Sequence, residues 1–212
     1  EQLEQFVSIL THDIRNPLNI IEGYSQQLKT EENASQVVKI ERAAGRMRAL
    51  IDDTLALYNE SDDVEDVTNI SVSEIADRAW QSVETADADL HIRDEFTIEC
   101  SPDRMCRMFE NLYRNAIEHN DESVTIEVGE YSTIGTSTRS SCSGFYVADN
   151  GTGIDSEDRK KVFEFGETSS KDGTGLGLPI VKRVADAHGW DTKIMDSATG
   201  GAKFVFMGAE TL

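Results

Sequence analysis

The spacing of apolar residues changes near residue 60, and this change constrains the fold of the 212-residue chain more than any other feature. Before it, apolar side chains recur at steps of three and four, which predicts two amphipathic helices separated by the polar break Thr30–Asn33. One helical hairpin cannot bury two apolar stripes well, so we expect residues 1–60 to form a homodimeric four-helix bundle. The first stripe is Leu3, Phe6, Leu10, Ile14, Pro17, Ile21, Tyr24 and Leu28, and the second is Val37, Ile40, Ala44, Met47, Ile51, Leu55 and Tyr58.

Residues 61–68 are acidic and nearly free of bulky apolar side chains, which predicts a linker into a second domain, residues 69–212. That domain mixes helical periodicity with short alternating segments, which predicts an α/β sandwich of the α+β kind with antiparallel strands. The stretch 149–176 is glycine-rich, and we expect it to be irregular with one short helix. We expect helices at about 71–86, 102–119 and 177–188, and strands at 90–93, 96–99, 123–130, 142–148, 190–196 and 202–208.

The formal net charge of −20, from 40 acidic and 20 basic residues, excludes several classes of protein. A nucleic-acid-binding domain needs a basic surface, and an anionic membrane repels an acidic one, so neither partner is expected. The acidic residues are dispersed along the chain, which favours a charged surface over a single acidic partner site. The sequence has no run of about 18 apolar residues and no signal peptide, so we expect a cytoplasmic domain without direct membrane contact.

The chain begins at Glu1, within a predicted helix, so we expect a fragment whose upstream sensor segment is missing. Its three cysteines, Cys100, Cys106 and Cys142, match no zinc-binding spacing. We expect them to be reduced, buried thiols.

His12 lies about 200° around its predicted helix from Leu10 and Ile14, so its imidazole points to solvent. An exposed imidazole followed by Asp13 places a base next to a nucleophile. Asn16 adds an amide one turn further along the same face. Alone, the pattern also fits an exposed helix histidine that has no role.

Asn111 and Asn115 project from one face of the predicted helix 102–119, because residues four apart share a face. Amide oxygens suit a hard divalent ion such as Mg²⁺, which keeps most of its waters and takes one or two protein oxygens. An ordinary polar helix face is the alternative.

Asp149 follows a predicted strand and opens the motif Asp149-Asn150-Gly151-Thr152-Gly153-Ile154. A buried aspartate at a strand end can accept a hydrogen bond from an exocyclic amine, and the glycines let the main chain approach a flat ring. An ordinary glycine turn is the alternative.

The motif Gly173-Thr174-Gly175-Leu176-Gly177-Leu178-Pro179 leads into the last predicted helix, where main-chain amides can bind phosphates. Its spacing differs from the dinucleotide and P-loop fingerprints. Before it, Phe163 and Phe165 precede the polar stretch Glu167–Asp172, which predicts a flexible lid with two aromatic anchors.

In this order and spacing, the motifs resemble the H box, N box, first glycine box, F box and second glycine box of sensor histidine kinases. The resemblance covers essentially the whole chain. It implies a dimerisation and histidine phosphotransfer domain followed by a Bergerat-type ATP-binding domain. It also implies an ATP-dependent protein histidine kinase of a two-component system, with Mg²⁺ as cofactor and a response-regulator receiver domain as partner. The dispersed acidic charge resembles that of members from halophiles.

The resemblance implies a role for each motif residue. His12 would accept the phosphoryl group, Asp13 would polarise its imidazole, and Asn16 would orient water in a phosphatase reaction. Asn115 would bind Mg²⁺, and Asp149 would accept from the adenine amino group. The other implied nucleotide-binding residues are Asn111, His119, Gly151, Gly153, Gly173, Gly175, Leu176 and Gly177.

The chain departs from the family pattern at the phosphate end of the implied site. Glu118 stands where many members carry a lysine, which leaves Arg114 and Lys171 as candidate cations. The lid is short and has no arginine after its aromatic box, and Ala202 stands where a threonine often lies near adenine.

Two other functions fit part of the pattern. Glu118 favours a signalling scaffold that binds nucleotide without transferring phosphate. A different Bergerat-type ATPase, such as a chaperone or topoisomerase module, is disfavoured by the helical hairpin that carries His12-Asp13.

Overall fold

The chain divides into two compact units, Glu1–Glu60 and Ser61–Leu212. In the second unit, the computed structural model describes Val64 and residues 66–85, 87–120, 123–133, 142–166, 175–209 and 211. In the first unit, it describes residues 19–21, 23–24, 39–40, 43–45 and 47.

The described residues of the first unit are helical on both sides of the predicted break. Lys39 donates a hydrogen bond to the hydroxyl of Tyr24 at 2.9 Å, and its ammonium lies 4.9 Å from the centre of that ring. This contact joins the two predicted helices within one chain. The sequence motif with His12, Asp13 and Asn16 lies outside the described residues.

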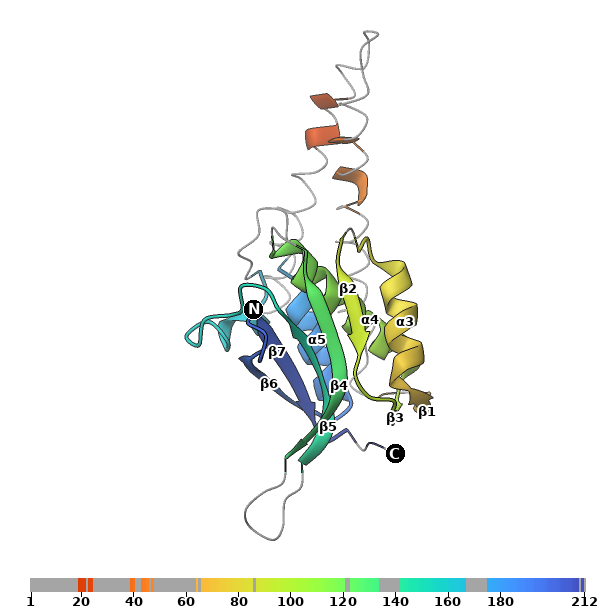
Figure 1. Cartoon of the computed structure of the whole chain (residues 1–212). Coiled ribbons are helices and arrows are strands. Elements are labelled where there is room, and N and C mark those ends of the chain that lie inside the picture. Colours follow the sequence, from red (N-terminus) through yellow and green to blue (C-terminus); the bar gives the residue numbers. More distant parts are fainter. Residues whose placement is uncertain are drawn as a thin grey trace. The chain divides into compact units, whose positions relative to one another are not determined.

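The second unit is an α/β sandwich, as the sequence predicts (Figure 1). Its strands are β1 (Thr68–Ser71), β2 (Asp89–Ile92), β3 (Thr97–Cys100), β4 (Thr125–Thr133), β5 (Cys142–Asp149), β6 (Asp191–Asp196) and β7 (Ala202–Met207). Its helices are α3 (Val72–Ser82), α4 (Pro102–Glu118) and α5 (Gly177–Ala187), with a 3-10 turn η1 (Lys161–Phe163). Five strands form one sheet in the order β2-β4-β5-β7-β6, and α4 and α5 lie behind it in Figure 1.

The core forms between the helices and one face of this sheet, because apolar residues alternate along the strands. Phe145 of β5 stacks on Phe206 of β7 with ring centroids 4.8 Å apart. Phe109 of α4 meets the ring of Phe145 edge-on at 6.1 Å and stacks on Tyr113 at 5.7 Å. All four side chains are fully buried, and each such burial stabilises the fold by about 1.5–3 kcal/mol.

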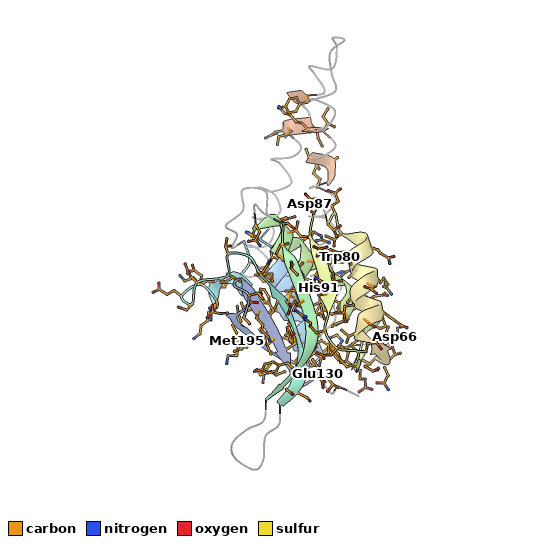
Figure 2. All side chains as sticks on the ribbon, viewed as in Figure 1. Asp66, Trp80, Asp87, His91, Glu130 and Met195 are labelled. Carbon is orange, nitrogen blue, oxygen red and sulfur yellow. The ribbon has the colours of Figure 1, made fainter. Side chains whose placement is uncertain are left out.

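The opposite face of the sheet carries charged side chains among its apolar ones. One register row crosses it through His91, Glu127, Ala148, Lys203 and Met195. Figure 2 labels the two ends of this row, His91 on β2 and Met195 on β6. The ammonium of Lys203 lies 3.5 Å from the centre of the Tyr146 ring, and burial lowers the pKa of this lysine. This face therefore covers its central aromatic side chain with a charged one.

The elements differ from the sequence prediction in several places. Helix α3 ends at Ser82 rather than near residue 86, and its N-cap residue Ser71 bonds the hydroxyl of Ser73 instead of a main-chain amide. Strand β1 was not predicted, and it places Thr68, assigned to the linker, in a two-stranded sheet with β3. Strand β2 runs parallel to β4 rather than antiparallel to a neighbour.

Cys100 and Cys106 are buried free thiols, as predicted, and burial raises the pKa of Cys100 to about 12. No helix within the described part of the chain combines the length and apolar character needed to cross a bilayer.

Candidate functional site

The carboxylate of Asp149 is buried and held in one orientation at the end of β5. Its Oδ1 accepts hydrogen bonds from the main-chain amides of Gly151 at 2.9 Å and Ala202 at 3.2 Å. Within the described part of the chain, both hydrogen bonds to this carboxylate end on Oδ1, which leaves Oδ2 to accept from a ligand. Burial raises the pKa of Asp149, and the two amide hydrogen bonds oppose that change.

A glycine turn between β6 and β7 packs directly against this carboxylate. Gly201 has a φ of 63°, and a Cβ there would lie 2.2 Å from Oδ1 of Asp149. A Cβ on Gly153 would lie 3.1 Å from the carbonyl oxygen of Gly201. Only glycine at position 201 therefore lets Asp149 keep its two hydrogen bonds. The sequence motifs did not assign Gly201 to the site, although Gly200-Gly201 is a visible glycine pair.

Asn120 holds the first glycine motif from the side of α4. Its Oδ1 accepts a hydrogen bond from the amide of Thr152 at 2.9 Å, and its Nδ2 donates to the carbonyl of Ala116 at 2.6 Å. A Cβ on Gly151 would lie 2.2 Å from both of these amide atoms. The sequence motifs did not indicate Asn120, whose only signal is a third asparagine directly after the helix that carries Asn111 and Asn115.

Asn111 connects α4 to the start of α5. It is only 3% exposed, and its Nδ2 donates to the carbonyl of Arg107 at 2.9 Å. A Cβ on Gly177 would lie 3.2 Å from Oδ1 of Asn111, so the amide oxygen faces the first residue of α5. Asn115 is half-buried one turn further along α4, so both predicted asparagines lie on one flank of this helix.

The residue before the predicted lid, Gly166, contacts Gly175 of the second glycine motif. The amide of Gly166 donates to the carbonyl of Gly175 at 3.1 Å, and a Cβ on Gly175 would lie 2.8 Å from the Cα of Gly166. The two described residues that flank the predicted lid are therefore in direct contact. Leu176 is buried as the N-cap residue of α5, whereas Gly173 lies outside the described residues.

The two predicted aromatic anchors differ in burial. Phe163 is half-buried in η1, but Phe165 is 42% exposed. Phe165 is therefore the more exposed of the two predicted anchors, and the lid that they would hold lies outside the described residues. His119, the C-cap residue of α4, is half-buried beside Asn120.

The amide oxygen of Asn115 offers a divalent ion one protein ligand rather than a complete set. Within the described ranges, no three His, Cys, Asp or Glu side chains gather into a metal-binding group. Mg²⁺ commonly takes one or two protein oxygens and fills its other positions with water and phosphate, and the amide oxygen of Asn115 suits that arrangement. Of the two candidate cations, Arg114 forms an ion pair with Glu110 on the same helix, with 3.6 Å between the guanidinium nitrogen and the carboxylate oxygen. Lys171 lies outside the described residues.

Two family models match the chain. Residues 100–209 match the histidine kinase-, DNA gyrase B- and HSP90-like ATPase family, and residues 2–61 match the His Kinase A phospho-acceptor domain. The first match contains every described residue of the candidate site.

The chain is similar to a phytochrome-like protein and to a sensor protein kinase. It is 26% identical to the phytochrome-like protein Cph1 of Synechocystis, over 96% of this chain and 29% of that protein. It is 30% identical to the sensor protein kinase WalK of Staphylococcus aureus, over 87% of this chain and 48% of that protein. The chain thus spans about half or less of the length of these relatives.

Solved structures share its fold. The histidine kinase ThkA, in complex with the response regulator protein TrrA, matches 98% of this chain and 61% of that chain with a TM-score of 0.72 and 21% identity. The mycobacterial sensor histidine kinase MprB matches 69% of this chain and 100% of that chain with a TM-score of 0.57 and 22% identity. The chain belongs to the histidine kinase-, DNA gyrase B- and HSP90-like ATPase family and, with its match to the phospho-acceptor domain, has the two domains of a histidine kinase core.

Proposed function

We propose that this chain transfers the γ-phosphoryl group of ATP to His12 and then to an aspartate on a response-regulator receiver domain. The observation that carries the proposal is the buried carboxylate of Asp149, whose second oxygen is left to accept from a ligand. It lies in an ATPase fold on the same chain as a phospho-acceptor domain.

The adenine end of the site is formed by Asp149 and the glycines around it. Oδ2 of Asp149 accepts a hydrogen bond from the exocyclic amine of adenine. A base that presents a carbonyl at this position cannot donate this bond, so the contact selects adenine. Glycine at positions 151, 153 and 201 lets the main chain pack closely around Asp149, which supports a fixed orientation of this carboxylate toward the base. His119 stacks on the base from the end of α4.

The phosphate end is formed by the asparagines of α4 and the start of α5. Asn111 orients the phosphates, Asn115 contributes an oxygen to Mg²⁺, and the second glycine motif supplies main-chain amides from Gly173, Gly175, Leu176 and Gly177. When bound, Mg²⁺ supplies positive charge that offsets the charge of the phosphate oxygens. The family lysine is absent here, so Arg114 and Lys171 are the cations that we assign to this end.

The reacting group is the imidazole of His12. Asp13 accepts a proton from the imidazole and raises its nucleophilicity, and Asn16 orients a water for dephosphorylation of the partner. We assign residues 1–60 to a homodimeric four-helix bundle, because their two apolar stripes need a second hairpin.

The partner and the setting follow from the phosphotransfer chemistry. The solved complex of ThkA contains a response regulator, which supports a receiver domain as the acceptor for this chain. ATP and receiver domains are found in the cytoplasm, so we place this core there, downstream of a sensor segment. The dispersed net charge of −20 supports adaptation to a salt-rich interior.

Incubation with ATP labelled on the γ-phosphate tests the proposal, with wild type compared to His12→Gln. We expect Mg²⁺-dependent label on the wild type that is labile in acid and stable in base, as a phosphohistidine is. His12→Gln should bind nucleotide with wild-type affinity and carry no label. Equal labelling of both proteins would contradict the assignment of His12.

A signalling scaffold remains the second candidate, because Glu118 places an exposed negative charge near the phosphate end. Nucleotide binding without any phosphoprotein, in low and high salt, would support it. Rapid release of inorganic phosphate without a phosphoprotein would instead support a different ATPase of this fold.

A further inference from the structure

Arg159 joins the loop that follows Asp149 to the far edge of the sheet. Its Nε donates to the carbonyl of Ile154, the last residue of the first glycine motif, at 3.1 Å. A second nitrogen of the same guanidinium donates to the carboxylate of Asp196 at the end of β6. One side chain therefore holds a main-chain atom of the loop and a side chain of an edge strand.

The contacts on either side of Arg159 form a closed path around the glycine motif. Asp196 pairs with Ala202 across the β6–β7 hairpin, and the amide of Ala202 donates to Asp149. The loop returns from Asp149 to Ile154 and back to Arg159. Because the guanidinium provides the last link in this path, it fixes the spacing between the two ends of the loop.

A short helical turn holds Arg159 itself in place. The amides of Asp158 and Arg159 both donate to the carbonyl of Asp155, at 2.9 Å and 3.2 Å. Only 23% of the Arg159 side chain is exposed, whereas 83% of the Asp196 side chain is. The arginine is thus the more buried partner, and the ion pair reaches solvent on its carboxylate side, where salt screens it.

We propose that Arg159 is a positioning residue for ATP, which holds the adenine-binding loop against the β6–β7 hairpin. The inference rests on the proposed nucleotide site, because the loop that it orders carries Gly151 and Gly153. The ion pair ends on a carboxylate that is 83% exposed, and a pair of this kind contributes little to global stability. The effect of removing it is therefore confined to the loop and to the affinity for nucleotide.

Three variants separate the two contacts of Arg159. Arg159→Ala removes both, Asp196→Asn weakens only the ion pair, and Arg159→Lys keeps a positive charge without the Nε–H donor. Asp103→Asn is the matched control, because the ion pair of Asp103 with Arg78 joins two helices away from the loop and its carboxylate side chain is 89% exposed.

The first measurement is hydrogen exchange without nucleotide. In Arg159→Ala we expect faster exchange at the amides of Gly151 and Thr152, with no change at Phe145 and Val147 in β5. Asp103→Asn should leave all four amides unchanged. This measurement needs no ligand, so it decides whether Arg159 orders the loop even if the wild type binds no ATP. Failure of the wild type to bind ATP would contradict the proposed function alone.

The second measurement is the dissociation constant of a fluorescent ATP analogue. Arg159→Ala should weaken binding by roughly threefold to tenfold, Arg159→Lys by less, and Asp196→Asn by about twofold. The double variant Arg159→Ala/Asp196→Asn should match Arg159→Ala, because the two residues act on each other. Thermal unfolding should be nearly unchanged in all of them.

Unchanged exchange in the loop of Arg159→Ala would overturn the inference, as would equal weakening of nucleotide binding by Asp103→Asn. If Arg159→Ala does not fold, Asp196→Asn carries the same test at smaller amplitude. Wild-type exchange and affinity in a folded Asp196→Asn would then overturn the inference.

Discussion

The ring of His188 accepts a hydrogen bond from the main-chain amide of Ser101 at 3.0 Å, and this bond joins the end of α5 to the start of α4. Because an amide can only donate, Nε2 of His188 carries no proton. The proton is on Nδ1, which donates to the carbonyl of Val184 at 2.8 Å. The ring also stacks on Trp190 with centroids 4.4 Å apart, so the fold requires a neutral imidazole.

The first prediction concerns pH. Burial lowers the pKa of His188, the hydrogen bond to Val184 opposes this, and the charge of Arg104 lowers it further. The unfolded chain therefore takes up a proton near pH 6.5 that the folded chain does not, so stability is lost as pH falls below about 6.5. A single group of this kind contributes at most about 1.4 kcal/mol per pH unit.

His188→Gln tests this prediction, because a glutamine oxygen can accept from Ser101 but does not titrate. Urea unfolding of both proteins between pH 5 and pH 7.5 should show a smaller loss of stability in acid for His188→Gln. Parallel curves for the two proteins would show that the fold does not depend on the neutral ring.

The second prediction separates stability from nucleotide binding at Asp149. In Asp149→Asn the amide oxygen can keep the hydrogen bonds from Gly151 and Ala202, and the cost of burying a charge is removed. We expect an unfolding temperature at or above that of the wild type. Nucleotide affinity should fall by about 10- to 100-fold, because an amide NH₂ replaces the acceptor that faces the ligand. Calorimetric titration with ATP measures this, and unchanged affinity would contradict the assigned role of Asp149.

The third prediction is a paired substitution. Gly151→Ala places a methyl group 2.2 Å from the amide of Asn120, which must move and lose its hydrogen bond from Thr152. We expect a loss of about 1–3 kcal/mol in the free energy of unfolding, together with weaker nucleotide binding. Asn120→Ser shortens the obstructing side chain and should recover part of both losses.

A helical glycine with free space around it provides the control. A Cβ on Gly45 would meet nothing within 4 Å, so Gly45→Ala should not destabilise the chain. If Asn120→Ser worsens Gly151→Ala instead of relieving it, the contact between the two residues is not the cause of the loss.

The fourth prediction concerns salt. A polyanionic nucleotide must bind a chain with a formal net charge of −20, and added salt screens the repulsion between them. We expect affinity for ATP, or the rate of labelling, to rise with KCl over a range in which most phosphate-binding proteins weaken. Titration with KCl, with folding followed by circular dichroism, tests this. A monotonic fall in a folded protein would refute salt adaptation.

Local signals predicted the two helices that flank the site. Ser101 and Pro102 mark the start of α4, and the observed helix Pro102–Glu118 differs from the predicted one by a single residue. Strand β1 has the sequence Thr-Asn-Ile-Ser, which shows no apolar alternation, so no local pattern could indicate it. Its position is set by pairing with β3.

Contacts between distant residues account for the site residues that the motifs did not indicate. Asn120 meets Thr152 across 32 positions, and Ala202 meets Asp149 across 53. Asn120 belongs to no motif and becomes part of the site only when the fold brings its segment next to the first glycine motif. A sequence motif indicates the residues expected to contact a ligand. It does not indicate the distant residues that hold them in position.

The hydrogen bond between Gly166 and Gly175 joins the two ends of the predicted lid, so the length of the lid can change without a change in the fold on either side. Eight residues lie between these glycines in the sequence, and both ends of that segment are fixed to each other. Doubling a loop between fixed ends costs only about 0.6 kcal/mol in closure entropy. A change in the length of this segment is therefore expected to leave the domain on either side of it intact.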